Sequence, residues 1–164
     1  MKKVLISQRR DPVDNRDEVR DGMDVRFASM LYVLGFLPIP LCSELHNAKG
    51  YLEALQPDAI LITGGNDIGE QPKRDMLETR LLDYAKEHNI PVFGICRGAQ
   101  IINHYLGGTT HPVKGHVATS HTLLGDWAER KGYSSVNSYH NFSITQDSIA
   151  KELDVLALTE DGVV

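Results

Sequence analysis

The chain has 164 residues, of which 41% are hydrophobic and 24% charged, and its formal net charge is −5. This length is enough for one domain with a hydrophobic core. The acidic balance argues against nucleic-acid binding, which needs a basic surface, and no apolar stretch is long enough for a membrane helix. The only cysteines, Cys42 and Cys96, form no disulfide framework, which favours the cytoplasm.

The first part of the chain alternates apolar runs typical of buried strands with segments whose apolar residues recur at helical spacing. We expect strands at 4–7, 37–41, 59–63 and 91–95, with 37–41 at a sheet edge because prolines interrupt it. We expect a loop at 8–15 and helices from Val19 to near Gly35, around 51–55, at 76–88 and at 97–106. This alternation indicates an α/β fold with a mostly parallel central sheet flanked by helices.

The pattern changes after Gly107-Gly108. We expect strands at 116–124, 135–139 and 155–159, joined by loops and one short helix near 149–153, as a partly antiparallel C-terminal extension of the sheet. Asp161-Gly162 is a hairpin-turn signal, and Val163-Val164 resemble the opening of a return strand. We therefore expect the natural polypeptide to continue beyond this point.

The segment most informative about chemistry is Gly94-Ile95-Cys96-Arg97-Gly98, where an apolar strand meets an amphipathic helix. It is the cysteine form of the G-x-S-x-G nucleophile elbow, in which glycines flank a turn too tight for side chains. The helix start favours the reactive thiolate of Cys96. The alternative is a buried structural cysteine, which leaves the paired glycines without a purpose.

An acyl-transfer nucleophile needs an oxyanion hole. The backbone N–H of Arg97, directly after Cys96, is the expected first donor. The second is expected from the loop Thr63–Asp67, at the carboxyl end of a neighbouring strand, with Gly65 as the candidate. The alternative for this loop is a tight turn without a ligand. The Arg97 side chain would either hold an acidic substrate or pair with a surface carboxylate.

Gln100 lies one helical turn beyond Cys96, so it could bind a polar substrate, or it could be an ordinary solvated helix residue. The general base is harder to assign. His111, His116 and His121 cluster in the sequence, but no cysteine or carboxylate spacing supports a metal site, so we expect none. His140 follows an expected strand and could line the pocket, but the residues alone do not make it the base.

Several segments together resemble class I glutamine amidotransferases. They are the elbow through Gln100, the upstream Gly64-Gly65-Asn66-Asp67, the intervening Lys73-Arg74-Asp75 with Glu78, and the downstream Gly107-Gly108. The closer resemblance is to the γ-glutamyl hydrolase-like branch, peptidase family C26, which includes γ-glutamyl-γ-aminobutyrate hydrolases. The segment 136–142, with Ser138, Tyr139 and His140, is similar to one that lines the γ-glutamyl pocket in this branch. Its His-Asn-Phe form looks most like hydrolases of γ-glutamyl-CDP-amidates.

The resemblance implies a flavodoxin-like fold and hydrolysis of a γ-glutamyl amide through a thioester on Cys96, without a cofactor. It places Gly65 and Arg97 at the oxyanion, and Gln100 with residues 138–140 on the glutamyl group. The family carries its catalytic histidine and glutamate in a C-terminal His-Pro-Glu segment, whereas the one His-Pro here is His111-Pro112, followed by valine. We therefore expect one domain over 1–164 that lacks its last strands and its His-Glu segment, and turns over poorly.

Two other functions stay open at this stage. The chain could be a glutaminase subunit that passes ammonia to a partner synthetase, or a non-catalytic relative that keeps the fold and binds a ligand. The first would show low activity that rises when the synthetase binds, while the second would not react selectively at Cys96. The amine half of the substrate and the oligomeric state are not set by the sequence.

Overall fold

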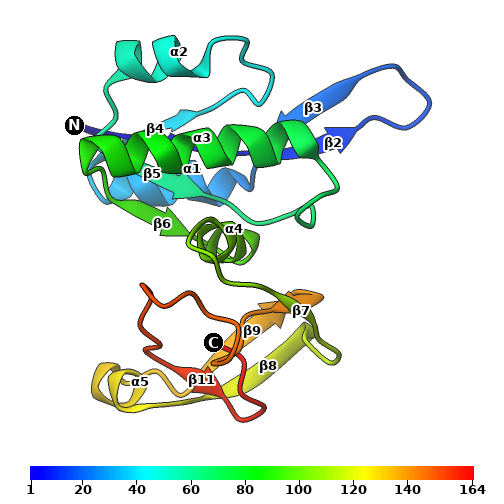
Figure 1. Ribbon diagram of the computed structural model, residues 1–164, viewed down its shortest axis with the longest axis vertical. Helices are drawn as coiled ribbons and strands as arrows, with labels where there is room; N and C mark the ends of the chain where they lie inside the picture. The colour runs from blue at the N-terminus through cyan, green and yellow to red at the C-terminus, as the bar shows by residue number, and fades with distance from the viewer. The chain divides into compact units, whose positions relative to one another are not determined.

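Runs of consecutive buried aliphatic residues form a parallel sheet in the first part of the chain, as Figure 1 shows for the computed structural model of residues 1–164. The chain divides into an N-terminal unit, Met1–Ile101, and a C-terminal unit, Ile102–Val164. The sheet of the N-terminal unit has four strands in the order β4-β1-β5-β6, all parallel. They are β1 (Lys2–Ile6), β4 (Phe36–Pro40), β5 (Ala59–Ile62) and β6 (Val92–Gly94). The predicted strands, including the edge position of the one with prolines, are confirmed.

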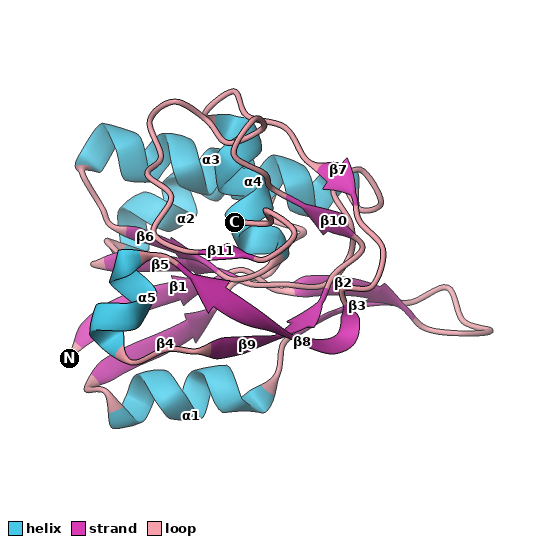
Figure 2. Cartoon of the chain, turned by 90° about the horizontal axis from the view of Figure 1, so that it is seen from below, coloured by secondary structure: helices cyan, strands magenta, loops and turns pink.

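Helices cover both faces of this sheet. Figure 2 shows α1 (Val25–Val33) on one face and α3 (Pro72–His88) on the other, and α2 (Ala48–Leu55) packs against α3. The helix α4 (Arg97–Tyr105) begins directly after Cys96. On the α1 face, Leu31 joins aliphatic residues of β1 and β5 in one buried cluster. Because the strands are parallel, the loops that follow β5 and β6 meet at one edge of the sheet, where ligands bind in such folds.

The prediction of a loop at 8–15 followed by a helix from Val19 is wrong for residues 9–22. They form an antiparallel hairpin of β2 (Arg9–Pro12) and β3 (Val19–Gly22). The helix α1 begins only after Asp24, whose side chain accepts a hydrogen bond from the Arg26 N–H at 2.9 Å and so caps the helix. Val19 shares the helical spacing of the apolar residues of α1, but it is exposed on a strand.

The C-terminal unit is built from antiparallel strands, as predicted. A three-stranded sheet has the order β11-β8-β9, and β10 pairs with β7. These strands form small sheets of their own instead of extending the parallel one. Their bounds are β7 (His111–Pro112), β8 (Val117–Leu124), β9 (Ser135–Tyr139), β10 (Phe142–Ser143) and β11 (Leu158–Thr159).

The short helix of this unit lies at α5 (Asp126–Lys131) and not at 149–153. Acidic residues open α5, basic residues close it, and Gly132 ends it in a left-handed conformation (φ 74°). Near 149–153 the chain makes turns, and the Ala150 N–H donates to the Asn103 side chain at 2.7 Å instead of to a helical carbonyl. The expected strand 155–159 is reduced to its last two residues. The turn after β11 is confirmed, and Val163 returns to pair with Thr145.

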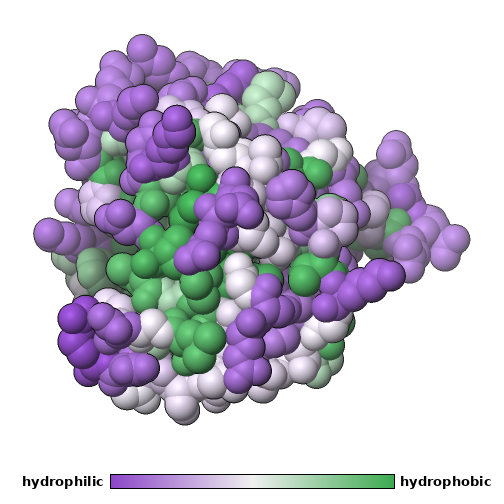
Figure 3. Space-filling view, turned by 60° about the horizontal axis from the view of Figure 1, so that its bottom comes forward, coloured by the Kyte–Doolittle hydropathy of each residue, from purple (hydrophilic) through white to green (hydrophobic).

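No helix of the structure is both long and apolar enough to cross a lipid bilayer. Large apolar side chains do reach the surface, where Figure 3 shows them in green among hydrophilic residues in purple. On the N-terminal unit the most exposed of them include Val25, Tyr32 and Val33 of α1 and Leu34 directly after it.

Candidate active site

Cys96 occupies a sharp turn between β6 and α4, with a positive φ of 53° that is rare outside glycine. Close backbone contacts leave no room for a side chain at Gly94 or at Gly98. A Cβ on Gly94 would lie 2.5 Å from the Gly98 backbone, and a Cβ on Gly98 would lie 2.0 Å from the Ile62 carbonyl oxygen of β5. Both distances are far below normal van der Waals contact. The turn is therefore a nucleophile elbow in shape, as the glycine spacing predicts.

The Cys96 side chain is exposed, so it is not the buried structural cysteine of the alternative interpretation. Surrounding atoms still remove enough water from the sulfur to raise the pKa of the Cys96 thiol above its usual value, and Asp67 acts in the same direction. The Arg97 backbone N–H and the positive charges of Arg74 and Arg97 lower this pKa, but they do not outweigh the desolvation. The Arg97 N–H, at the start of α4, therefore acts on the Cys96 pKa in the expected direction without making it low. The thiol needs a base or a high pH to ionise.

The double-glycine loop after β5 passes directly beside this sulfur. A Cβ on Gly64 would lie 3.8 Å from the Cys96 Sγ and 3.4 Å from its Cβ. Gly65 has a φ of 81°, which a side chain rarely adopts, and its own Cβ position faces the Arg9 side chain at 3.3 Å. The predicted meeting of this loop with the elbow is therefore present in the structure, and any larger residue at position 64 would approach the sulfur.

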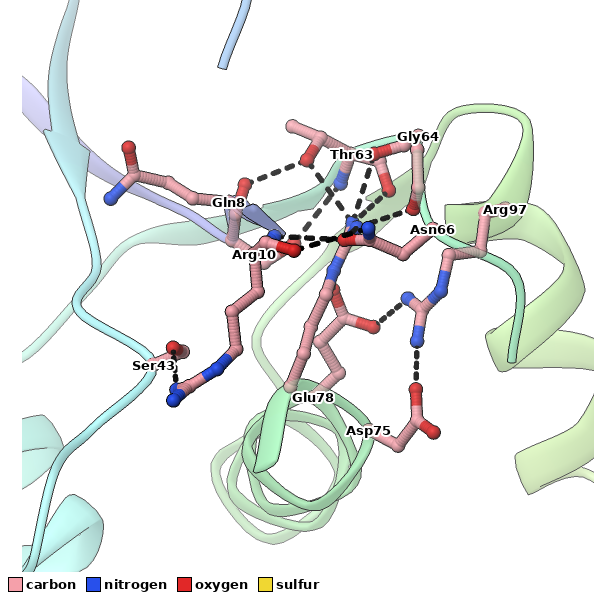
Figure 4. Close-up of polar contacts among 12 residues, drawn as sticks. Gln8, Arg10, Ser43, Thr63, Gly64, Asn66, Asp75, Glu78 and Arg97 are labelled. Atoms are coloured by element: carbon pink, nitrogen blue, oxygen red, sulfur yellow. Dashed lines mark hydrogen bonds and ion pairs between the residues drawn. The ribbon is translucent and has the colours of Figure 1, made fainter. Parts of the chain in front are cut away.

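Arg97 does not hold a substrate with its side chain, and its partners are not on the surface. The guanidinium points away from the elbow to α3, where it pairs with the buried carboxylate of Glu78 and with Asp75 (Figure 4). Its Nε is buried without a hydrogen-bond partner. Only the backbone N–H of Arg97 faces Cys96. Gln100, also on α4, is buried, so the alternative of an ordinary solvated helix residue is wrong. Its backbone N–H donates to the Cys96 carbonyl at 3.2 Å.

Residues 138–140 lie in the C-terminal unit, at the end of β9 and just beyond it. The Ser138 hydroxyl is buried and donates to the His116 carbonyl (2.6 Å), while the Tyr139 side chain is exposed. His140 Nε2 lies 2.9 Å from His116 Nδ1, and His116 Nε2 lies 2.6 Å from a carboxylate oxygen of Asp161. A carboxylate only accepts, so His116 Nε2 carries a proton, and with a neutral His116 the His140 Nε2–H donates to Nδ1. That arrangement leaves His140 Nδ1 as an acceptor.

Desolvation lowers the pKa of His140, and the neighbouring His116 and His121 lower it further, so His140 favours its neutral form. Sequence reasoning missed the partners of this histidine. In the sequence, His116 groups only with the histidines near it, and Asp161 stands only as part of a turn. The antiparallel pairing of β8 with β9, and the turn after β11, bring them together.

Side chains of the same cluster are the ones that could hold a metal ion. Single ligand atoms of His116, His121 and Asp161 lie within 4.8 Å of one another, so the structure supplies the carboxylate that sequence spacing lacked. Both ring nitrogens of His116 are already hydrogen-bonded. The rings of His116 and His121 are stacked, with centroids 3.9 Å apart and 19° between planes. His140, His116 and Asp161 form a hydrogen-bonded chain, whereas His121 Nε2 is buried without a hydrogen-bond partner.

We expect Asp161 to make the C-terminal unit sensitive to acid. Hydrogen bonds from Thr159 and His116 lower the pKa of Asp161 to about 2. Because this pKa is lower than in the unfolded chain, the ionised carboxylate stabilises the folded state above pH about 4, and the contribution is lost as the pH falls towards 2. In urea unfolding monitored between these pH values, Asp161→Asn should flatten the loss of stability. Glu152→Gln, at an exposed carboxylate of the same unit, is the control; equal pH dependence in both variants would contradict the assignment.

The chain is similar to known proteins over most of its length. Residues 9–127 match the peptidase C26 family. The γ-glutamyl-CDP-amidate hydrolase of Campylobacter jejuni is 31% identical over 135 residues, covering 79% of this chain and 62% of that protein. The carbamoyl phosphate synthase small chain of Aquifex aeolicus is 34% identical over 113 residues, covering 68% of this chain and 29% of that one. The chain thus spans less than two thirds of either relative.

The fold has a solved counterpart. The crystal structure of a glutamine amidotransferase from Thermotoga maritima superposes with a TM-score of 0.67 at 16% identity, covering 99% of this chain and 69% of that one. A likeness at this identity supports the α/β fold with its parallel sheet. The family match covers most of the sequence and includes both the double-glycine loop and the elbow. The chain therefore belongs to the peptidase C26 family.

Proposed function

We propose that this protein hydrolyses a γ-glutamyl amide, with Cys96 as the nucleophile. The observation that carries the proposal is the exposed sulfur at a positive-φ elbow with the Gly64-Gly65 loop against it. A cysteine so placed serves no packing purpose. The family membership supports amide hydrolysis, and the name of the Campylobacter relative makes a γ-glutamyl-CDP-amidate the first substrate to test. We place both units in one glutamine amidotransferase-like domain that works in the cytoplasm.

In the proposed reaction the Cys96 Sγ attacks the side-chain carbonyl carbon of the glutamyl group. The N–H groups of Gly65 and Arg97 stabilise the tetrahedral oxyanion. The C–N bond then breaks, and the amine leaves with a proton. Water attacks the γ-glutamyl thioester, which releases glutamate and restores the thiol. Gln100, one helical turn beyond Cys96, holds the glutamyl group, and no cofactor is needed because the net reaction only adds water across the amide bond.

The thiol proton limits this reaction in the present chain. Desolvation keeps the pKa of Cys96 high, and residues 1–164 contain no His-Pro-Glu segment to supply the family's base. We therefore propose that acylation of Cys96 is slow at neutral pH and accelerates as the pH approaches the thiol pKa. Loss of a triad member commonly leaves a residual rate about 10³–10⁴ above the uncatalysed reaction, which remains measurable.

An electrophilic glutamine analogue tests the proposal. A diazo-ketone analogue should alkylate Cys96 and spare Cys42, because recognition of the glutamyl group brings the reactive carbon only to the elbow. Both cysteines are exposed, so Cys42 is an internal control for simple thiol reactivity. Peptide mapping by mass spectrometry gives the readout, and excess glutamine should slow the labelling. Equal labelling of both residues would reject the proposal and favour a non-catalytic relative.

A second function is favoured by two observations. The chain is similar to a carbamoyl phosphate synthase small chain over 68% of its length, and large apolar side chains of α1 are exposed, as expected of a surface that docks a partner. In this alternative the chain is a glutaminase subunit that passes ammonia to a synthetase. The activity of such a glutaminase rises when its synthetase is added, whereas that of a free-standing hydrolase does not.

A further inference from the structure

We propose that Arg74, Glu78 and Arg97 form a buried positioning network that fixes the double-glycine loop and the elbow relative to each other. The proposal rests on the proposed function, because it concerns the two backbone donors assigned to the oxyanion. All of its residues lie in the N-terminal unit. None of the three side chains touches the reacting atoms; each acts through the backbone that the network holds.

The first half of the network is the grip of Arg74 on the loop. Its guanidinium is fully buried on the first turn of α3. Its Nη atoms donate to three successive carbonyl oxygens, at 2.8 Å for Thr63, at 3.0 Å for Gly64, and to Gly65. Peptide groups are planar and trans, so a Gly64 carbonyl turned towards Arg74 directs the Gly65 N–H the opposite way. The guanidinium thereby sets the direction of one proposed oxyanion donor.

The second half is the connection to the elbow through Glu78. One carboxylate oxygen of Glu78 accepts from Arg74 Nε at 2.9 Å, and the other accepts from Arg97 Nη1. Arg97 carries the other proposed donor on its backbone, directly after Cys96, and its second Nη atom pairs with Asp75 (Figure 4). A single carboxylate thus links the residue that orients the Gly65 N–H to the residue that bears the second N–H.

Burial and charge make the network stiff. Arg74 and Glu78 have no exposed surface and Arg97 has 2%, while two cations are matched by Glu78 and Asp75. Buried ion pairs contribute little to stability compared with apolar residues of similar size, but they permit few alternative arrangements. A site that must hold two donors around one oxygen needs that geometric restriction.

The test compares two reactions of the same sulfur in the full chain. Acylation by γ-glutamyl p-nitroanilide needs the oxyanion donors, whereas alkylation by iodoacetamide forms no oxyanion. For Glu78→Gln we expect acylation in a single turnover to slow about 100-fold, while alkylation of Cys96 and the affinity for the anilide stay near wild type. Glu53→Gln is the matched control, because Glu53 also pairs with a basic residue at i,i+4 but on an exposed face.

If Glu78→Gln does not fold, as judged by circular dichroism, Asp75→Asn replaces it. Asp75 borders the network and is more exposed than its members, and this substitution removes only one anchor of Arg97. A smaller loss of acylation with unchanged alkylation is then expected. Wild-type acylation in either folded variant would overturn the positioning role, and so would an equal loss of acylation and alkylation. Absence of acylation in the wild type itself would instead reject the proposed function.

Discussion

Replacing Cys96 by alanine is expected to abolish release of the amine from γ-glutamyl substrates. In the proposed mechanism the thioester forms only on this sulfur, so the rate should fall by up to about 10³–10⁴-fold, the whole acceleration expected of a site without its base. The fold should remain intact, because the side chain is exposed and alanine keeps its Cβ. A single-turnover assay with a chromogenic anilide at alkaline pH, where the thiol ionises without a base, gives the rate.

Cys42→Ala is the matched control, since it removes the other exposed thiol of the same unit. It should release the amine at the wild-type rate. A Cys96→Ala variant that still releases the amine in proportion to enzyme would show that another residue, or no covalent intermediate, performs the reaction.

Replacing Gly98 by alanine is expected to destabilise the protein by at least about 3 kcal/mol, a large part of the stability of an ordinary domain. The added Cβ would lie 2.0 Å from the Ile62 carbonyl oxygen and 2.7 Å from its carbon, both on the backbone of β5. The strand cannot retreat without moving the loop beside Cys96. Helix propensity alone predicts the opposite sign, because alanine is about 1 kcal/mol better than glycine in a helix. Urea unfolding therefore separates the two effects by direction.

Gly22→Ala is the control, because its Cβ would meet only the Asp11 side chain, at 3.9 Å. It should change the free energy of unfolding by less than about 0.5 kcal/mol. Wild-type stability in Gly98→Ala would mean that the turn is looser than described, and that the elbow does not depend on its glycines.

The elbow could be predicted from sequence because its requirements are local. A tight strand-to-helix turn demands glycine on both sides of Cys96, and the demand is visible as spacing. The parallel sheet was equally accessible, since strands buried on both faces are continuous apolar runs. The meeting of Gly64 with Cys96 followed from one topological rule, that successive parallel strands end at the same edge.

The network behind the elbow was not accessible in this way. The apolar residues of α3 suggest a start at Met76, but the helix begins at Pro72, and its buried first turn carries Arg74. Prediction from periodicity assumes that apolar residues are buried and charged ones exposed, whereas here Arg74 is buried and Met76 is exposed. The family resemblance includes Arg74, Asp75 and Glu78 but does not say what they contact, and the i,i+4 spacing of Arg74 and Glu78 most often marks an exposed pair.

The contacts of the C-terminal unit escaped prediction for a different reason. The bond between His116 and Asp161 joins residues far apart in sequence, and it depends on where the turn after β11 places the carboxylate. Hairpin positions such as Val19 likewise take their structure from a partner strand and not from their own spacing. Long-range pairing of this kind leaves no periodic trace in one sequence.

Trapping the covalent intermediate tests the central claim most directly. The chain is mixed with a γ-glutamyl anilide at alkaline pH, quenched in acid, and measured by intact-mass and peptide-mapping mass spectrometry. We predict an added mass of one γ-glutamyl group on the peptide that contains Cys96, none on the Cys42 peptide, and none in Cys96→Ala. Release of the anilide amine with no mass added to Cys96 under any quench would contradict the thioester mechanism and the assignment of this cysteine.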